Sequence, residues 1–262
     1  MDPQTAAAAL KGKPDRGMEA AFSVPFPMPK AKEKGKDMRD IHFIRHGATE
    51  YNNDDVSVDR MRGWKDIPLS KDGREEAHKL GENLKGGEAQ PDSLHTSDLH
   101  RAAETANIIS QITGTPVAEV SEAFRPWNVG DLAGKSSKEG IPILAEYSQN
   151  KPDEPVPGGE SFNDFMSRFF GGLHSTLENS KGAPGIVAHH RNERALHSWA
   201  KAGHPADGSI DMSEFNKKGE HTGAITKLSI PMDRLRAAAQ ARNGKGVKGN
   251  GSDATNKPAT RN

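Results

Sequence analysis

The sequence predicts an α/β fold whose central sheet is mostly parallel and is covered by helices on both faces. Two observations carry this prediction. Short apolar runs of strand length alternate with longer segments whose apolar residues recur at helical spacing, and parallel strands need such a crossover between them. Two of the apolar runs also lead directly into histidine residues. Because ligands bind beyond the carboxyl ends of the strands in such sheets, those histidines mark the expected site.

The first regular pattern is an apolar run at Ile41–Ile44, which predicts a buried strand. This strand would deliver Arg45 and His46 to its carboxyl end. After an irregular polar stretch, Ser70 is placed to cap a helix over about residues 71–85. The chain therefore starts its ordered part with a strand, a long loop and a helix.

A second, brief strand is predicted at residues 94–96, followed by a helix that ends at Gly114. Either Ser97 or Asp98 would cap this helix. Arg101 would then lie in the first turn, where its guanidinium and the positive end of the helix face the same anion.

Residues 121–160 are rich in Gly and Pro and predict a long excursion with one short helix near residues 143–148. Ser161, with Asp164 three residues later, begins the next helix. Its apolar residues recur at helical spacing and predict core packing: Phe162, Phe165, Phe169, Leu173 and Leu177.

The run Gly185–Ala188 predicts another buried strand, and it leads into His189 and His190. A helix to about Lys201 follows, and residues 224–230 predict the last strand. The ends of the strands at Ile44 and Ala188 would lie at one edge of the sheet, so both sets of histidines would meet there.

Both ends of the chain are unusually polar, consistent with a mean hydropathy of −0.79. Neither end has enough apolar surface, when buried, to offset the entropy lost on ordering the chain. We therefore expect one domain at 39–231 between disordered tails at 1–38 and 232–262. The second tail is basic. Such tails either contact an acidic partner or simply stay solvated.

The chain contains no cysteine, which excludes disulfides, thiolate catalysis and metal sites with Cys ligands. No apolar run reaches the length of a membrane span, and the first residues lack the basic-then-apolar plan of a signal peptide. We therefore expect a soluble, cytoplasmic protein.

The tripeptide Arg45-His46-Gly47 has the chemistry of phosphoryl transfer. A neutral imidazole can attack phosphorus and carry the phosphoryl group. The guanidinium offers a planar, charged fork for two phosphate oxygens, and Gly lets the backbone approach an anion. With Arg101 and His189 at the same edge, the residues form a pocket that favours a multiply charged anion.

With these residues in order, the sequence resembles the histidine phosphatase superfamily, also called phosphoglycerate mutase-like, over about residues 39–230. The matching blocks are Arg45-His46-Gly47 with Thr49 and Asn52, Arg62-Gly63 with Asp66 and Pro68, Ser97-Asp98 with Arg101, Gly158 with Glu160 and Ser161, then His189 and Gly223. The resemblance implies a three-layer α/β/α sandwich and chemistry without metal or other cofactor. It also implies a phosphoryl acceptor at His46, phosphate binding by Arg45, Gly47, Arg101 and His189, and an entrance lined by Thr49, Asn52 and Arg62.

One departure from the family pattern concerns the proton donor. Relatives carry a Glu where this chain has Pro126, which cannot donate a proton. We expect His190 to replace it, ahead of Asp131, with Glu122 and Glu160 as further candidates. Alternatively, no acid is needed because the leaving group is already good.

The sequence therefore predicts a metal-independent phosphatase that works through a phosphohistidine on His46. Its substrate would be a phosphorylated small molecule or protein. The alternative is a phosphate-binding scaffold that has lost turnover, and Pro126 favours this alternative. A sugar-phosphate mutase is the least favoured, since it must move protons in both directions.

Overall fold

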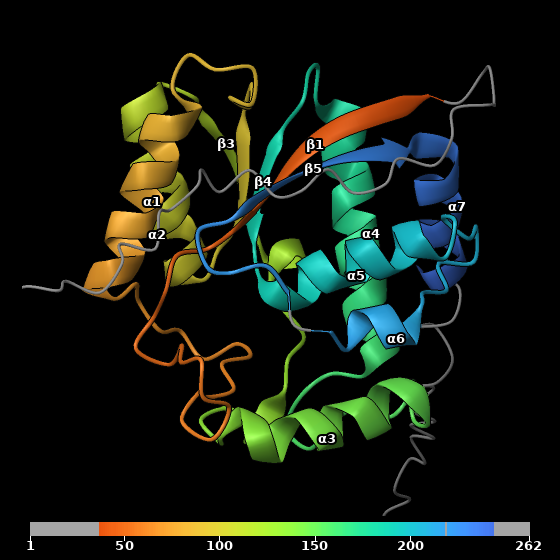
Figure 1. Cartoon of the computed structure of the whole chain (residues 1–262). Coiled ribbons are helices and arrows are strands. Elements are labelled where there is room, and N and C mark those ends of the chain that lie inside the picture. The colour runs from red at the N-terminus through yellow and green to blue at the C-terminus, as the bar shows by residue number, and fades with distance from the viewer. Residues whose placement is uncertain (1–36, 218, 244–262) are drawn as a thin grey trace, which may run out of the picture.

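The computed structural model describes residues 37–217 and 219–243, which form three layers with a sheet in the middle (Figure 1). The sheet has five strands in the order β3-β2-β4-β1-β5. Their bounds are β1 (Met38–Arg45), β2 (Leu94–Ser97), β3 (Val117–Ser121), β4 (Gly185–Ala188) and β5 (Ile225–Pro231). All neighbouring pairs are parallel except β1 and β5. The prediction of a mostly parallel sheet is confirmed.

Helices cover both faces of this sheet (Figure 1). One face carries α1 (Lys71–Leu84) and α2 (His100–Thr113), and the other carries α4 (Phe162–Asn179), α5 (His190–Lys201) and α7 (Met232–Asn243). The connections contain α3 (Ser137–Gln149), α6 (Met212–Phe215) and two short 3₁₀ turns, η1 (Glu122–Phe124) and η2 (Gly130–Leu132). The three-layer sandwich expected from the resemblance is therefore present.

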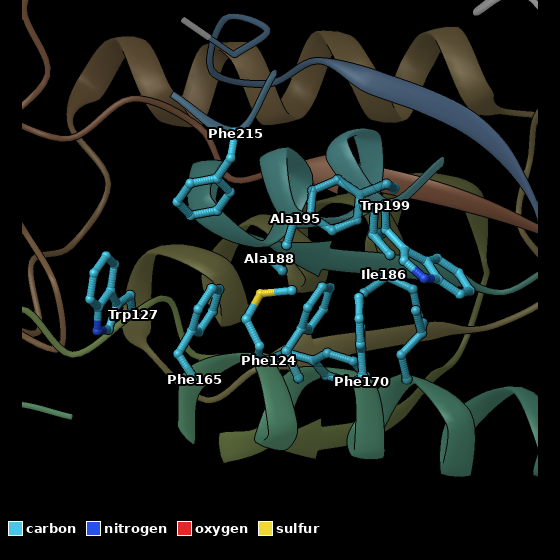
Figure 2. Close-up of a cluster of buried hydrophobic side chains, with 14 of the residues drawn as sticks. Phe124, Trp127, Phe165, Phe170, Ile186, Ala188, Ala195, Trp199 and Phe215 are labelled. Carbon is cyan, nitrogen blue, oxygen red and sulfur yellow. The ribbon is translucent and has the colours of Figure 1, made fainter. Parts of the chain in front are cut away.

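Alternating residues of the central strands fill two separate cores. Ile44 and Val187 face α1 and α2, whereas Phe43 and Ile186 face the layer with α4 and α5. The second core is the larger and is rich in aromatic rings (Figure 2). The predicted apolar stripe of α4 lies entirely in this core, so its residues serve packing.

The starts of the helices match the sequence prediction at two places and differ at a third. Ser70 caps α1 by accepting the Gly73 N–H, and Ser161 caps α4. The prediction for α2 is wrong, since its N-cap is Leu99 and no side chain caps it. The carboxylate of Asp98 instead binds the Arg125 guanidinium (2.8 Å), which is a contact between residues distant in sequence.

The excursion after α2 holds more regular structure than its Gly and Pro content predicts. β3 forms an edge strand that the sequence analysis missed. α3 spans 13 residues and begins with a capping box at Ser136 and Glu139, whereas the sequence predicts only its second half. Gly140, a residue unfavourable in helices, allows α3 to pack closely on Met61.

The predicted domain boundary at residue 231 is wrong at the carboxyl end, because α7 continues the fold to Asn243. Met232, Leu235 and Ala238 are buried there in the larger core, against the layer that contains α4. The other parts of the predicted tails, residues 1–36 and 244–262, lie outside the described residues. Within the described part of the chain, no helix combines the length and apolarity that crossing a bilayer requires.

Candidate active site

The carboxyl ends of β1 and β4 bring two histidines together. The backbone N–H of His46 donates to the carbonyl of Ala188 (3.1 Å), which ties the end of β1 to the residue before His189. The two imidazole rings lie edge to face, with centroids 5.1 Å apart and an interplanar angle of 62°. Both side chains are buried. The predicted convergence of His46 and His189 is therefore present.

The tautomer of His46 follows from its one backbone contact. Nδ1 lies 2.7 Å from the carbonyl oxygen of Gly47, and because a carbonyl only accepts, Nδ1 must carry the hydrogen. The Nε2 atom of a neutral ring then bears the lone pair. Burial, with the charges of Arg101 and Arg45, holds the pKa of His46 well below its usual value. The ring is thus neutral at physiological pH, and a neutral imidazole has the chemistry of a nucleophile.

Arg101 projects from the first turn of α2 and is fully buried. Its Nη1 donates to the carbonyl of Lys65 and its Nη2 to that of Gly63, both at 2.9 Å. Burial, together with the charge of Arg62, lowers the pKa of Arg101 to about 9. The guanidinium stays charged at neutral pH and is held in one orientation by two neutral acceptors.

Two further guanidiniums complete the positive field. Arg45 Nη1 donates to the carbonyl of Glu220, in the segment before β5. Arg62 Nη1 donates to Asp59 Oδ1 (3.2 Å) and to the carbonyl of Tyr51 (3.1 Å). The charge of Arg62 also contributes to the lowered pKa of both site histidines. Arg62 therefore acts on the same site as the other two arginines.

The ring nitrogens of His189 have no hydrogen-bond partner in the described chain: both Nδ1 and Nε2 are buried and unbonded. Burial and then Arg101 lower the pKa of His189. The Nε atoms of Arg45 and Arg101 are also buried and unpartnered within the described residues. Because buried polar atoms without partners are costly, this set of unsatisfied groups between cations indicates an oxyanion ligand.

Thr49 and Asn52 of the predicted entrance, and Gly47 of the predicted phosphate site, have other contacts within the protein. Thr49 donates to Asn52 Oδ1 through both its backbone N–H and its hydroxyl, each at 2.9 Å. Gly47 packs on the start of α1, where a Cβ atom would lie 2.3 Å from the Gly73 carbonyl oxygen. Its N–H donates to Thr105 (3.1 Å). Gly47 is therefore required for this close backbone contact.

The structure contradicts the expectation that His190 is the proton donor. Its Nε2 accepts the backbone N–H of Gly219 (2.9 Å) and so carries no proton there. Burial and the charges of Arg45 and Arg191 lower the pKa of His190 well below its usual value. A proton donor at this position needs an imidazolium, but this ring is neutral and its Nε2 lone pair is engaged.

The carboxylates proposed as substitutes are engaged elsewhere or exposed. Glu160 binds the Arg168 guanidinium (2.7 Å), and Glu122 pairs with Arg125 (2.9 Å). Asp131 is exposed. The carbonyl of Pro126 accepts hydrogen bonds from Arg168 and from Trp64 Nε1 (2.8 Å). The backbone at Pro126 is thus held by two hydrogen bonds, and its side chain has no proton to donate.

Two acidic residues near the site were missed from sequence. Glu76 of α1 accepts the Ala48 N–H (2.9 Å) and the Thr222 hydroxyl (3.0 Å), joining the loop after His46 to the segment before β5. Glu193 of α5 is buried four residues after His189, a spacing that places both near one helix face. That spacing was the available signal. Among the described residues, no group of three or more His, Asp or Glu side chains is arranged to hold a metal.

Comparison with known proteins identifies relatives of this chain. The family model described as "Histidine phosphatase superfamily (branch 1)" matches residues 41–233. An uncharacterized phosphatase of Bacillus subtilis is 32% identical over 171 residues, covering 64% of this chain and 80% of the relative. A metal-independent phosphoserine phosphatase of Arabidopsis thaliana is 31% identical over 160 residues, covering 59% and 65%. The structure of a mycobacterial glucosyl-3-phosphoglycerate phosphatase superposes with a TM-score of 0.56 and 26% identity, covering 73% of this chain and 90% of that one.

Proposed function

The chain belongs to the histidine phosphatase superfamily and is an enzyme of the phosphatase type, and we propose that it hydrolyses phosphate monoesters through a phosphohistidine on His46. The observation that carries this proposal is the state of the His46 ring. Its Nδ1–H is fixed on the Gly47 carbonyl, so the Nε2 lone pair is the nucleophile. Its lowered pKa keeps that lone pair available.

In the first step, His46 Nε2 forms a bond to phosphorus and the bond to the leaving oxygen breaks. The leaving oxygen departs with the electron pair and takes a proton from solvent. In the second step, water attacks phosphorus, loses a proton to solvent, and the bond to Nε2 breaks, which releases inorganic phosphate and neutral His46. Arg45, Arg101 and Arg62 offset the charge on the phosphoryl oxygens throughout.

The proposed substrates are phosphorylated small molecules or protein side chains. Two relatives support this class by their names, one a phosphoserine phosphatase and the other a glucosyl-3-phosphoglycerate phosphatase. The chemistry proposed here routes no step through a metal, because the charges on the phosphoryl group are met by guanidiniums and a second imidazole.

The test is hydrolysis of a chromogenic aryl phosphate in the presence of a chelator. We expect His46→Ala to lower kcat by several orders of magnitude, in line with the about 10⁶-fold loss when a catalytic nucleophile is removed from another hydrolase. His78→Ala, on the exposed side of α1, is the matched control and should keep full activity. Brief reaction with labelled substrate should also give an acid-labile phosphoenzyme in wild type alone. Retained turnover in a folded His46→Ala would exclude the mechanism.

A second candidate is a protein that binds phosphate without turning it over. The observation that favours it is Pro126, whose side chain cannot donate a proton and whose carbonyl accepts hydrogen bonds from Trp64 and Arg168. The same assay separates the two candidates. Phosphate binding without aryl phosphate turnover in wild type would favour the binding protein.

A further inference from the structure

Glu193 is a buried carboxyl to which the mechanism above gives no role. It lies in the first turn of α5 and is 1% exposed. Its Oε2 atom has no hydrogen-bond partner in the part of the chain that the structure describes. Because burying such a group is costly, a function is a better explanation for its position than packing.

The chain passes directly over this carboxyl just before β5. A Cβ atom at Gly219 would lie 2.9 Å from Glu193 Oε2. The next residue, Glu220, joins two charged groups through its backbone: its carbonyl accepts from Arg45 Nη1, and its N–H favours the charged form of Glu193. One peptide segment therefore connects the buried carboxyl with an arginine of the phosphate site.

The charges of the two groups also act on each other. Burial raises the pKa of Glu193 to about 7, and Arg45 is the strongest opposing influence. Burial likewise lowers the pKa of Arg45 to about 10, and Glu193 is the charge that most opposes this. The other charged or titratable groups that face the pair are Glu220, Arg194 and His190 around Glu193, and Arg62, Asp59 and Glu76 around Arg45.

Resting on the proposed function, we propose that Glu193 is a positioning residue that controls, through Arg45, how strongly the site binds a phosphate-like anion. When the carboxyl is charged, it competes with the anion for Arg45. When the carboxyl is protonated, the full charge of Arg45 acts on the anion. Glu193 itself does not contact the ligand. Anion binding should therefore weaken as pH rises through neutrality, and bound anion should favour the protonated carboxyl.

Sulfate is the probe, because it remains a dianion from mildly acidic to mildly alkaline pH and is not turned over. Calorimetric titration of wild type should show affinity falling on the order of tenfold from about pH 6 to about pH 8, which corresponds to a one-unit rise in the Glu193 pKa on binding. Glu193→Gln should bind sulfate with the affinity seen at low pH and should retain it across the range. Glu75→Gln, an exposed change on α1, is the matched control and should keep the wild-type slope.

Proton uptake gives a second readout. Near neutral pH, wild type should take up protons on binding sulfate, and Glu193→Gln should take up fewer. The site histidines are present in both proteins, so the difference isolates Glu193. Glu220→Gln keeps the backbone contacts but removes a charge that raises the Glu193 pKa, so it should move the midpoint of the wild-type profile to lower pH.

An unchanged slope in Glu193→Gln would overturn the inference, as would a midpoint that does not move in Glu220→Gln. The second result counts even if Glu193→Gln does not fold. Sulfate binding does not require turnover, so this inference and the proposed phosphatase reaction can fail independently. Loss of the pH dependence with intact aryl phosphate turnover would overturn only the role of Glu193.

Discussion

Because neither Pro126 nor His190 can donate a proton from the positions described, turnover should depend steeply on how readily the leaving group departs. In phosphoryl transfer the leaving oxygen carries much of the negative charge at the transition state, and a positioned acid is worth about 10²–10⁴ in rate. Pro126 presents only a hydrogen-bonded carbonyl, and His190 accepts a hydrogen bond at Nε2. We therefore expect kcat/KM for an activated aryl phosphate to exceed that for an alkyl phosphate by about 10³ or more.

The assay is a series of substituted phenyl phosphates of similar size, extended by glycerol phosphate. Formation of the phosphoenzyme would be followed in single turnover, so that the second step does not mask the first. A plot of log rate against the leaving-group pKa should be steep. An alkyl phosphate hydrolysed within about tenfold of the aryl compounds would refute the reasoning, because an acid would then be supplying the 10²–10⁴. In that case the donor would be identified as the residue whose replacement slows the alkyl phosphate most, among the variants Asp131→Asn, Glu122→Gln, Glu160→Gln and His190→Gln.

Three further predictions concern the fold around the site. Leu235→Ala should lower the free energy of unfolding by about 2–4 kcal/mol in a urea titration, because it removes a fully buried side chain from α7; a change below 1 kcal/mol would mean that α7 does not pack as described. Arg168→Gln should lower the free energy of unfolding by roughly 3 kcal/mol, because Arg168 donates to four backbone carbonyls between Glu122 and Pro126 and pairs with Glu160. Lys181→Gln, at an exposed position, should leave the free energy of unfolding unchanged. Glu193→Gln should gain stability relative to wild type as pH rises, measured by thermal unfolding. The pKa of Glu193 is raised from 4.5 to about 7 in the folded state, so wild type loses up to roughly 3 kcal/mol through that window and the variant does not.

The strands that carry the site could be predicted because their signal is local. The runs before Arg45 and His189 are short and mostly apolar, and both form buried strands that pair in parallel with each other. Parallel pairing then places both strand ends at one edge of the sheet without further information. The meeting of His46 and His189 follows from this topology, which is why it could be anticipated.

The elements that were missed depend on partners far along the chain. β3 is an edge strand that pairs only with β2, and its five residues show little alternation of polar and apolar side chains. α7 is rich in Ala, and its few larger apolar residues make a helix only because the larger core receives them. Neither segment has enough local pattern to distinguish it from a loop or a tail.

The error at His190 has the same origin. The hydrogen-bond partner of His190 is Gly219, 29 residues later in the chain. The backbone N–H of Gly219 reaches the ring only when the segment before β5 lies over α5. The protonation of a histidine follows from its contacts and the charges around it. Position next to His189 in sequence therefore could not assign His190 a role.

Burying the charged groups of the site lowers the stability of the folded protein and prepares the site to bind an anion. Arg101 is buried among neutral carbonyl acceptors, and its pKa is lowered to about 9 as a result, so the folded protein bears part of the cost of burying that charge. By the proposed function, a phosphate-like dianion would supply the missing counter-charge and meet the unpartnered donors of Arg45 and Arg101. A bound ligand stabilises the folded state by an amount that grows with the logarithm of its concentration relative to Kd. A site built in this way binds anions tightly because its cations are held in place before the ligand arrives.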